Sequence, residues 1–258
     1  MGAAEIKQDQ SSQAGSIQTL CEFVAIDLAM LAALHDREPD VPLLIALRKA
    51  GFPCGMGLTL VGESGLQSMD LMQRVITALP EEFDTAMLNE LAADYAGIYL
   101  NYAIHASPEE SVWIDDENLA CQESMFQVRS WYEQYGLGAE NWRIRPDDHL
   151  VLQLQFLSHL FAHNQTVSGL QKAARFMDEH LLRWLMSFAD RVAARCDTAY
   201  FAAVAMLTGA YCEELRDLLA KVLTEPRPSA EEIEERMKPR RQAEAVPVSF
   251  MPGMGPAV

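Results

Sequence analysis

The chain has 258 residues, of which 50% are hydrophobic, and a formal net charge of −17. A chain of this length and composition buries a sizeable core, and we expect one large domain with tails. The strong negative charge argues against nucleic acids and anionic membranes as partners, because their phosphate groups repel it. A basic partner is favoured instead.

The longest apolar run, from Tyr200 to Cys212, is shorter than the roughly 20 residues that a membrane span needs. No transmembrane helix and no membrane insertion are therefore predicted. The first ten residues lack the basic region and apolar core of a secretory signal. We expect a cytoplasmic protein.

Residues 1–15 are small and polar, and disorder is expected there. From Ser16, a candidate N-cap, apolar residues recur at three- and four-residue spacing and predict a helix to about Leu34. The same spacing predicts further helices over residues 42–49, 66–79, 81–104, 125–135, 150–163, 170–188 and 200–222.

No stretch alternates with the period of two that marks a strand, so the prediction is an all-α, single-domain bundle of about seven to ten helices. The helical domain is expected to span residues 16–223. Residues 224–258 are rich in Pro and Gly towards the end, which predicts a largely disordered tail. A short helix from Ala230 to Met237 is compatible with that tail.

Charge is unevenly distributed along the chain. Between Arg74 and Arg129 there is no Lys or Arg, whereas eleven acidic residues fall in this stretch. One interpretation is a solvated surface that keeps the protein soluble. The other is an acidic face that binds a cationic ligand. The loop after Ile104 adds Val112, Trp113 and Ile114, three large apolar residues that either tuck onto the core or form a contact surface.

Asp147, Asp148 and His149 follow Pro146 where a helix is predicted to begin. One interpretation places the two carboxylates in the first turn, where they compensate the helix dipole. The other is a binding site at the helix start.

Motifs for catalysis and for metal or cofactor binding are missing from the sequence. His159 and His163 lack the intervening Glu of H-E-x-x-H, and the five cysteines form no C-x-x-C pair. The glycine-rich loop from Gly51 to Gly57 has no phosphate-binding pattern. We predict no catalytic residue, no metal site and no cofactor.

Three segments taken together resemble the TorD/DmsD family, the cytoplasmic chaperones that mature twin-arginine-exported molybdoenzymes. The first joins Tyr95 to Leu100 with a loop similar to the family's P-x-x-S-V-(W/Y) motif, Pro108 to Trp113. The second is similar to the family's E-P-x-D-H signature and ends in Pro146-Asp147-Asp148-His149. The third follows the family's last helices, from Phe176 to Tyr211. The resemblance covers about residues 17–222.

The resemblance implies a TorD-like helical fold and a non-enzymatic chaperone that binds the twin-arginine signal peptide and the apo form of a molybdopterin-dependent oxidoreductase. It implies further partners among the proteins that make the molybdenum cofactor, and a monomer or a homodimer. The signal-peptide-binding residues carried over by the resemblance are Asp148, His149, Pro146, Trp113, Ser111, Tyr95 and Tyr99. Arg145 departs from the signature, which usually has Glu at that position.

Two alternatives stay open at this point. The chain is also similar, more distantly, to NarJ-type assembly chaperones, which serve a molybdoenzyme that is not exported. An enzyme that hydrolyses a phosphorylated substrate at Asp148 and His149 is the third hypothesis. The residues alone do not identify the client.

Overall fold

The computed structural model describes residues 3–115 and 119–238, and of residues 3–14 the backbone only. The elements, in chain order, are α1 (Ala3–Asp36), α2 (Val41–Ala50), α3 (Glu63–Thr77), α4 (Thr85–Tyr95), the π-helical turn η1 (Ala96–Leu100), α5 (Ser111–Ile114), α6 (Glu123–Glu133), α7 (Leu150–His163), α8 (Val167–Glu179), the 3-10 turn η2 (Leu181–Arg183), α9 (Leu185–Arg195), α10 (Ala199–Leu223) and α11 (Ala230–Met237).

The all-α prediction is confirmed, since the ranges 3–115 and 119–238 contain helices and no strand. Eleven α-helices appear there, slightly more than expected, partly because α5 is a single turn of four residues. The helix predicted over 81–104 is shorter than expected. It begins at Thr85, capped by the Asp84 side chain, and passes into the π-helical turn after Tyr95.

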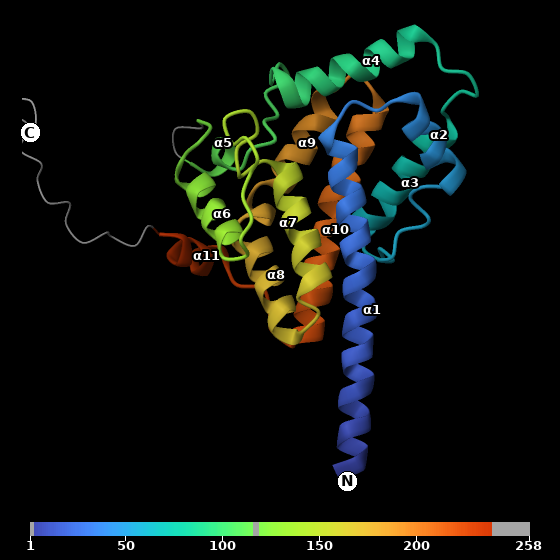
Figure 1. Ribbon diagram of the computed structural model, residues 1–258. Helices are drawn as coiled ribbons and strands as arrows, with labels where there is room; N and C mark the ends of the chain where they lie inside the picture. The colour runs from blue at the N-terminus through green and yellow to red at the C-terminus, as the bar shows by residue number, and fades with distance from the viewer. Residues whose placement is uncertain (1–2, 116–118, 239–258) are drawn as a thin grey trace, which may run out of the picture. The chain divides into compact units, whose positions relative to one another are not determined.

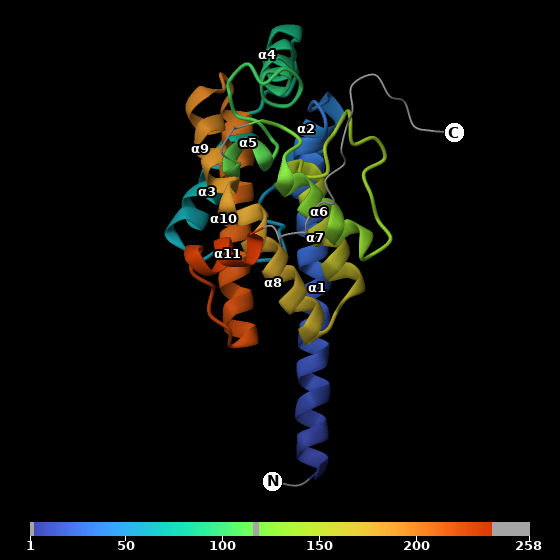
Figure 2. The same ribbon diagram turned by 90° about the vertical axis from the view of Figure 1, so that its left-hand side faces the viewer.

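Helix α10 is the centre of the fold between Met1 and Arg227, and packs against α3, α8 and α9 (Figures 1 and 2). Its 25 residues include buried side chains on several faces, as expected of a helix surrounded by others. Tyr211 is fully buried, and its hydroxyl donates a 2.9 Å hydrogen bond to Asp27 of α1. The predicted helix over 200–222 is thus the core of the bundle.

Helix α1 packs along α7 and begins at Ala3 rather than at Ser16. The backbone of residues 3–15 is thus helical in the structure, where the sequence predicted disorder over residues 1–15. Residues 3–14 contain no Gly or Pro, and half of them are Ala or Gln, which favour helix and allow the backbone to continue without a break. Residues 1–2 lie outside the described range.

Within the described residues, Gly15–Asp36 is one helical segment that is long and apolar enough to cross a membrane by length and composition. This segment was not predicted as a candidate span from the sequence, because polar residues interrupt its apolar run. Half of this window is buried inside the protein, with Leu28 and Leu31 fully inaccessible. A core helix with one apolar face passes the same test as a membrane span.

Several acidic side chains hold loops in place. Asp27 accepts hydrogen bonds of 3.0 Å from the backbone N–H groups of Gly57 and Leu58. Buried Asp94 accepts in the same way from the two residues that precede α10, at 3.0 and 2.7 Å. The acidic stretch between Arg74 and Arg129 is therefore partly structural, since a buried carboxylate needs such donors to offset its desolvation.

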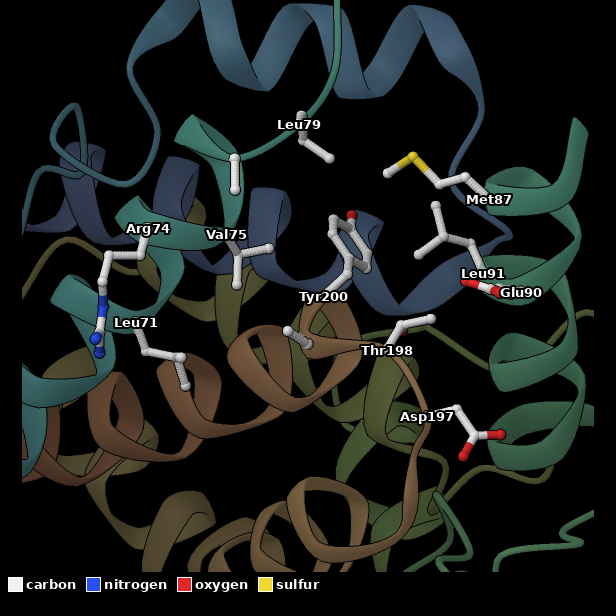
Figure 3. Close-up of a pocket in the computed structure, with 12 residues that line it drawn as sticks. Leu71, Arg74, Val75, Leu79, Met87, Glu90, Leu91, Asp197, Thr198 and Tyr200 are labelled. Carbon is white, nitrogen blue, oxygen red and sulfur yellow. The ribbon is translucent and has the colours of Figure 1, made fainter. Parts of the chain in front are cut away.

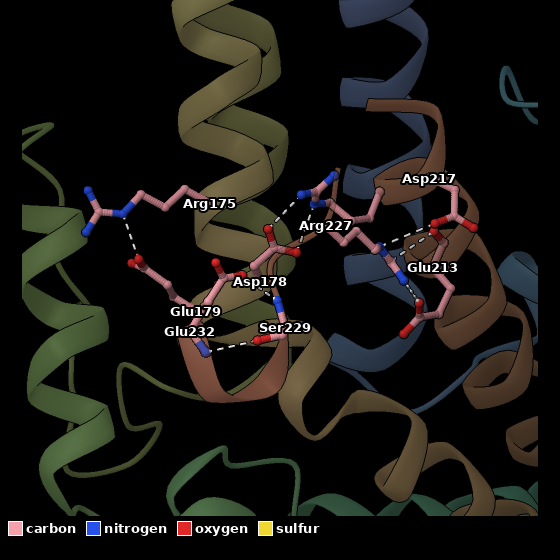
Figure 4. Close-up of polar contacts among 9 residues, drawn as sticks. Arg175, Asp178, Glu179, Glu213, Asp217, Arg227, Ser229 and Glu232 are labelled. Carbon is pink, nitrogen blue, oxygen red and sulfur yellow. Dashed lines mark hydrogen bonds and ion pairs between the residues drawn. The ribbon is translucent and has the colours of Figure 1, made fainter. Parts of the chain in front are cut away.

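Residues Pro228–Val258 form a separate unit. Its helix α11 has the bounds that the sequence allowed, and Ser229 and Glu232 form a reciprocal capping box at its start (Figure 4). Of the tail over 224–258 that was predicted to be largely disordered, residues 239–258 lie outside the described residues. At the end of the first unit, Arg227 pairs with Glu213 at 2.7 Å (Figure 4).

Candidate functional site

Two sequence motifs that lie far apart in the chain meet in the structure. An antiparallel bridge joins Glu109 to His149, and the backbone N–H of Leu150 donates to the carbonyl of Pro108 at 2.8 Å. The Asp148 carboxylate accepts a 2.8 Å hydrogen bond from the backbone N–H of Ser111. We call residues 107–111 and 146–150 together the junction.

The carboxylates precede helix α7 rather than occupying its first turn. Helix α7 begins at Leu150, and His149 is its N-cap, whose Nδ1 accepts a 3.1 Å hydrogen bond from the N–H of Val151. The interpretation that Asp147 and Asp148 compensate the dipole from within the first turn is therefore wrong. An imidazole caps the helix, which leaves both carboxylates available for other contacts.

Asp147 is bound by residues of α6. Arg129 donates to its Oδ2 from Nε at 3.0 Å and from an Nη at 2.8 Å, and the Tyr132 hydroxyl donates to its carbonyl at 2.8 Å. The Arg129 guanidinium also lies 5.3 Å from the ring centre of Phe126 and 5.1 Å from that of Trp142, both exposed. A carboxylate with flanking aromatic faces is thus already occupied by an arginine of the chain itself.

A further buried carboxylate of the junction belongs to Glu110. Glu110 is fully buried, accepts a 2.6 Å hydrogen bond from the Gln153 amide and lies 3.0 Å from Nδ1 of His180. The Gln153 amide also donates to the carbonyl of Asp148 at 3.1 Å. Helices α7 and α8 are therefore linked to the junction by a polar network in an otherwise apolar core.

Buried polar atoms without a partner gather at this place. Of the buried side-chain atoms for which the described residues supply no hydrogen bond, half belong to the junction or to Gln153: Ser107 Oγ, Glu109 Oε2, Ser111 Oγ, Asp148 Oδ1 and Gln153 Oε1. An unpaired buried polar group costs about 1–3 kcal/mol. Three of these atoms are carboxylate or amide oxygens, which only accept hydrogen bonds, and the other two are hydroxyl groups, which can donate as well as accept.

Burial also shifts the titration of the junction. It raises the pKa of Asp148 to about 6, although the contacts with Ser111 oppose the shift. Burial raises the pKa of Glu109 as well, and a hydrogen bond from Tyr102 opposes that shift. Burial, helped by the positive charge of Arg145, lowers the pKa of His149 to about 3. At neutral pH the junction therefore carries ionised Asp148 beside a neutral imidazole.

The structure brings together five of the seven residues carried over by the resemblance. Pro146, Asp148, His149 and Ser111 are buried in the junction, and half-buried Trp113 donates a 2.8 Å hydrogen bond to the carbonyl of Ser107. The Arg191 guanidinium stacks 4.3 Å from the Trp113 ring centre. The sequence left open whether Val112, Trp113 and Ile114 pack onto the core or form a contact surface. The Trp113 ring packs onto the core.

Tyr95 and Tyr99 lie elsewhere. The Tyr95 hydroxyl donates to the carbonyl of Asp36 at 2.8 Å, and the Tyr99 hydroxyl lies 2.5 Å from Nδ1 of buried His35. Both tyrosines therefore contact residues at the end of α1. The resemblance grouped these two tyrosines with the junction residues, but in the structure they lie outside the junction.

Arg145 has a structural partner that the sequence did not reveal. Its guanidinium forms an ion pair with Asp36 and donates to the carbonyl of the same residue at 3.2 Å. These two residues and Glu140 line a cavity of about 820 Å³ beside the signature. The cavity is therefore lined by charges of both signs, and the positive charge of Arg145 opposes the binding of a basic ligand there.

Glu110, Gln153, His180 and the Arg129–Asp147 pair were missed by sequence reasoning. The signal available was weak: Glu110 lies inside the recognised loop motif, and Gln153 interrupts an apolar helical face. Neither pattern reveals a partner that is 43 or 70 residues away.

Comparisons with known proteins find similar sequences. A family profile described as "Nitrate reductase delta subunit" matches residues 66–190, which include the whole junction. The chain is 31% identical over 159 residues to the chaperone protein TorD of Shewanella oneidensis, covering 59% of this chain and 70% of that protein. For TorD of Vibrio cholerae the values are 31% over 144 residues, 53% and 65%, and for TorD of Photobacterium profundum 25% over 170 residues, 63% and 76%.

Proposed function

The chain belongs to the TorD family of chaperones, and from this premise we propose that it binds the twin-arginine leader and the apo form of a molybdopterin-dependent oxidoreductase. The chaperone protects its client in the cytoplasm until the cofactor is inserted, and releases it before export. Proteins that make the molybdenum cofactor are further partners in this proposal. It acts by binding and carries no catalytic residue.

The observation that supports the leader-binding proposal is a group of three buried acceptor oxygens, unpaired in the part of the chain that the structure describes, at the junction and on the adjacent Gln153. Asp148 Oδ1, Glu109 Oε2 and Gln153 Oε1 lack donors among the described residues. An arginine side chain brings five N–H donors in a planar fork and no acceptor. A guanidinium inserted here would supply donors to these oxygens, and ionised Asp148 would supply the opposite charge.

Tyr102 is the side chain that the leader has to displace. It is 37% exposed, and its hydroxyl donates a 2.8 Å hydrogen bond to Glu109 Oε1. A leader arginine would replace a neutral donor by a charged one, and charge-assisted hydrogen bonds are about twice as strong. Trp113 and Ser111 then line the bound segment, while Tyr95 and Tyr99 act at a distance from the junction.

A titration with synthetic leaders tests the proposal. A fluorescent peptide with an intact Arg-Arg pair and a matched Ala-Ala peptide are titrated into the purified chain, and anisotropy is followed. We expect the Ala-Ala peptide to bind at least about tenfold more weakly, because each charged hydrogen bond contributes about 1.5–3 kcal/mol. Equal affinity for both peptides would contradict leader recognition.

Substitutions test whether Asp148 and His149 bind the leader. An Asp148→Asn/His149→Ala double variant should lose the preference for Arg-Arg over Ala-Ala. Asp190→Asn, at an exposed position of α9, is the matched control and should retain it. Circular dichroism checks that both chains fold. A double variant that is folded and keeps the preference would place the leader outside the junction.

The family profile named after the nitrate reductase delta subunit favours a second candidate, a NarJ-type chaperone for a molybdoenzyme that is not exported. Such a chaperone binds the N-terminal segment of its client without needing an arginine pair. Client N-terminal peptides with and without twin arginines distinguish the two functions. Tight binding of an arginine-free client peptide at the junction would favour the second.

A further inference from the structure

A second cavity lies between α3, α4 and the connection from α9 to α10, and no junction residue lines it. It measures about 500 Å³, within the range of roughly 300–1,000 Å³ that is usual for ligand sites. Figure 3 shows its lining. Most of that lining is apolar, with Leu71 and Val75 from α3 and Met87 and Leu91 from α4.

Two hydroxyl groups in this lining are unpaired. Tyr200 is 3% exposed, and Figure 3 shows its hydroxyl pointing between Leu79 and Met87 towards the middle of the lining residues. Neither Tyr200 Oη nor Thr198 Oγ1 has a hydrogen-bond partner within the described parts of the chain. Each hydroxyl retains an unused O–H donor. A ligand with acceptor atoms would therefore complete the cavity.

The rim of the cavity is acidic on one side. Glu90 and Asp197 are exposed and lie together on the same side of the close-up in Figure 3. Arg74 lies on the other side, but its guanidinium is paired with Asp70 at 3.0 Å. The chain has no Lys or Arg from residue 75 to residue 128 to balance the acids of α4. A positively charged group on the ligand is favoured at this side.

We propose that this cavity binds the C-terminal turn of a basic amphipathic helix from a partner protein. The last four carbonyl groups of a helix lack partners within the helix, so they can accept from Tyr200 and Thr198. Apolar residues three or four positions apart fill the space between α3 and α4, as in other helix-in-groove complexes. Lys or Arg in the last turn of the partner helix then meets Glu90 and Asp197.

The probe is a fluorescent synthetic helical peptide with leucines along one face and lysines in its last turn, titrated into the full chain. Tyr200→Phe is the first variant. Since its hydroxyl bonds to nothing described, its loss should leave the melting temperature of the free protein unchanged or slightly raised. Peptide affinity should fall about threefold to tenfold, the effect of one hydrogen bond.

A second variant fills the cavity from its mouth. Ala199→Trp replaces an exposed lining residue and should abolish peptide binding, whereas Ala193→Trp, exposed on α9 and outside the lining, should not. Asp148→Asn should leave this binding unchanged, so the test is independent of the leader-binding proposal. Binding should also weaken as salt is added, because the rim charges are exposed.

Three results would overturn the proposal. The first is equal affinity of the peptide for Tyr200→Phe and the natural chain. The second is equal binding of a peptide whose terminal lysines are replaced by glutamates. The third is full competition by octylamine at a concentration comparable to that of the peptide, which would make this a site for small cationic amphiphiles.

Discussion

The Asp148 carboxylate receives a 2.8 Å hydrogen bond from the backbone N–H of Ser111, although 37 residues separate the two in the chain. One carboxylate oxygen is thereby fixed in place. The other, Oδ1, is buried and has no partner among the described residues. The contact therefore joins the two family motifs and leaves one carboxylate oxygen free to accept a hydrogen bond. The proposed recognition of an arginine depends on that unpaired oxygen.

The Asp148→Asn variant should gain stability relative to the natural chain as pH rises. The folded pKa of Asp148, about 6, lies above its ordinary value of 3.8, so the folded state holds the proton more tightly. Its contribution to stability is fully present below about pH 4 and is lost as pH rises through 6. The stability difference between variant and natural chain should shift by roughly 2–3 kcal/mol in favour of the variant from pH 4 to pH 7.

Urea unfolding at the two pH values measures this shift. The difference in unfolding free energy between variant and natural chain is compared at pH 4 and pH 7. The cost of placing an amide in the junction is the same at both pH values and therefore cancels. Asp190→Asn serves as the matched control, because Asp190 is exposed. A pH-independent difference for Asp148→Asn would mean that the carboxyl is not destabilised by burial.

His35 should make the protein sensitive to acid. It is 1% exposed, and its Nε2–H donates to the Thr208 hydroxyl at 2.9 Å, since that hydroxyl itself donates to Val204. Burial lowers its pKa from 6.5 to about 3. Between these values the unfolded chain binds the proton and the folded chain does not, so stability is present above about pH 6.5 and is lost towards pH 3.

His35→Gln tests this directly. The variant should be less stable at pH 7 but lose stability less steeply below pH 6.5, by up to about 1.4 kcal/mol per pH unit. His163→Gln, at an exposed position, is the matched control and should follow the natural chain. Parallel pH profiles for His35→Gln and the natural chain would refute the buried neutral imidazole.

Arg145→Glu should weaken the fold slightly and strengthen leader binding. The Arg145 and Asp36 side chains are 34% and 38% exposed, so we expect the loss of their ion pair to cost only about 1 kcal/mol. A carboxylate at position 145 would add an acceptor for a guanidinium at the edge of the cavity beside the signature. Arg-Arg leader affinity should rise severalfold in the peptide titration.

Arg143→Glu is the matched control for this substitution, because it makes the same charge change at an exposed neighbouring position. If both variants raise the affinity equally, the gain is long-range electrostatic attraction. A gain confined to Arg145→Glu supports a direct contact. A lower affinity for Arg145→Glu would show that Arg145 itself supports the bound state.

Removing Asp178 should destabilise the bundle strongly. Its carboxylate and the Arg216 guanidinium form two hydrogen bonds of 2.8 Å, and both residues are buried. Asp178→Ala leaves an uncompensated buried charge and should cost about 3–5 kcal/mol. The double variant Asp178→Leu/Arg216→Met should recover most of that loss.

Chemical unfolding of Asp178→Leu, Arg216→Met and the double variant completes this cycle. Asp70→Ala is the comparison, because Asp70 pairs with Arg74 at the surface, where the side chains are 66% and 69% exposed. That substitution should cost less than about 1 kcal/mol. Similar costs for Asp178→Ala and Asp70→Ala would contradict the predicted dependence on burial.

The sequence by itself determined the helical class and most helix positions. Apolar residues at three- and four-residue spacing mark the face that a helix buries, and that signal is local. The end of α2 before Gly51 likewise follows from local chemistry, a left-handed glycine. The start of α4 was predicted too early, at residue 81, because the capping carboxylate of Asp84 was not recognised. The motif combination that identifies the family was also readable in the chain.

Only the tertiary structure decided what the signature residues contact. Asp148 bonds to Ser111, Asp147 to Arg129, and Arg145 to Asp36, across separations of 37, 18 and 109 residues. A carboxylate at a helix start has the same local pattern whether it caps, binds or pairs. Its partner is fixed by how distant segments pack, and burial, which shifts the pKa of Asp148 and leaves Oδ1 unpaired, exists only after that packing.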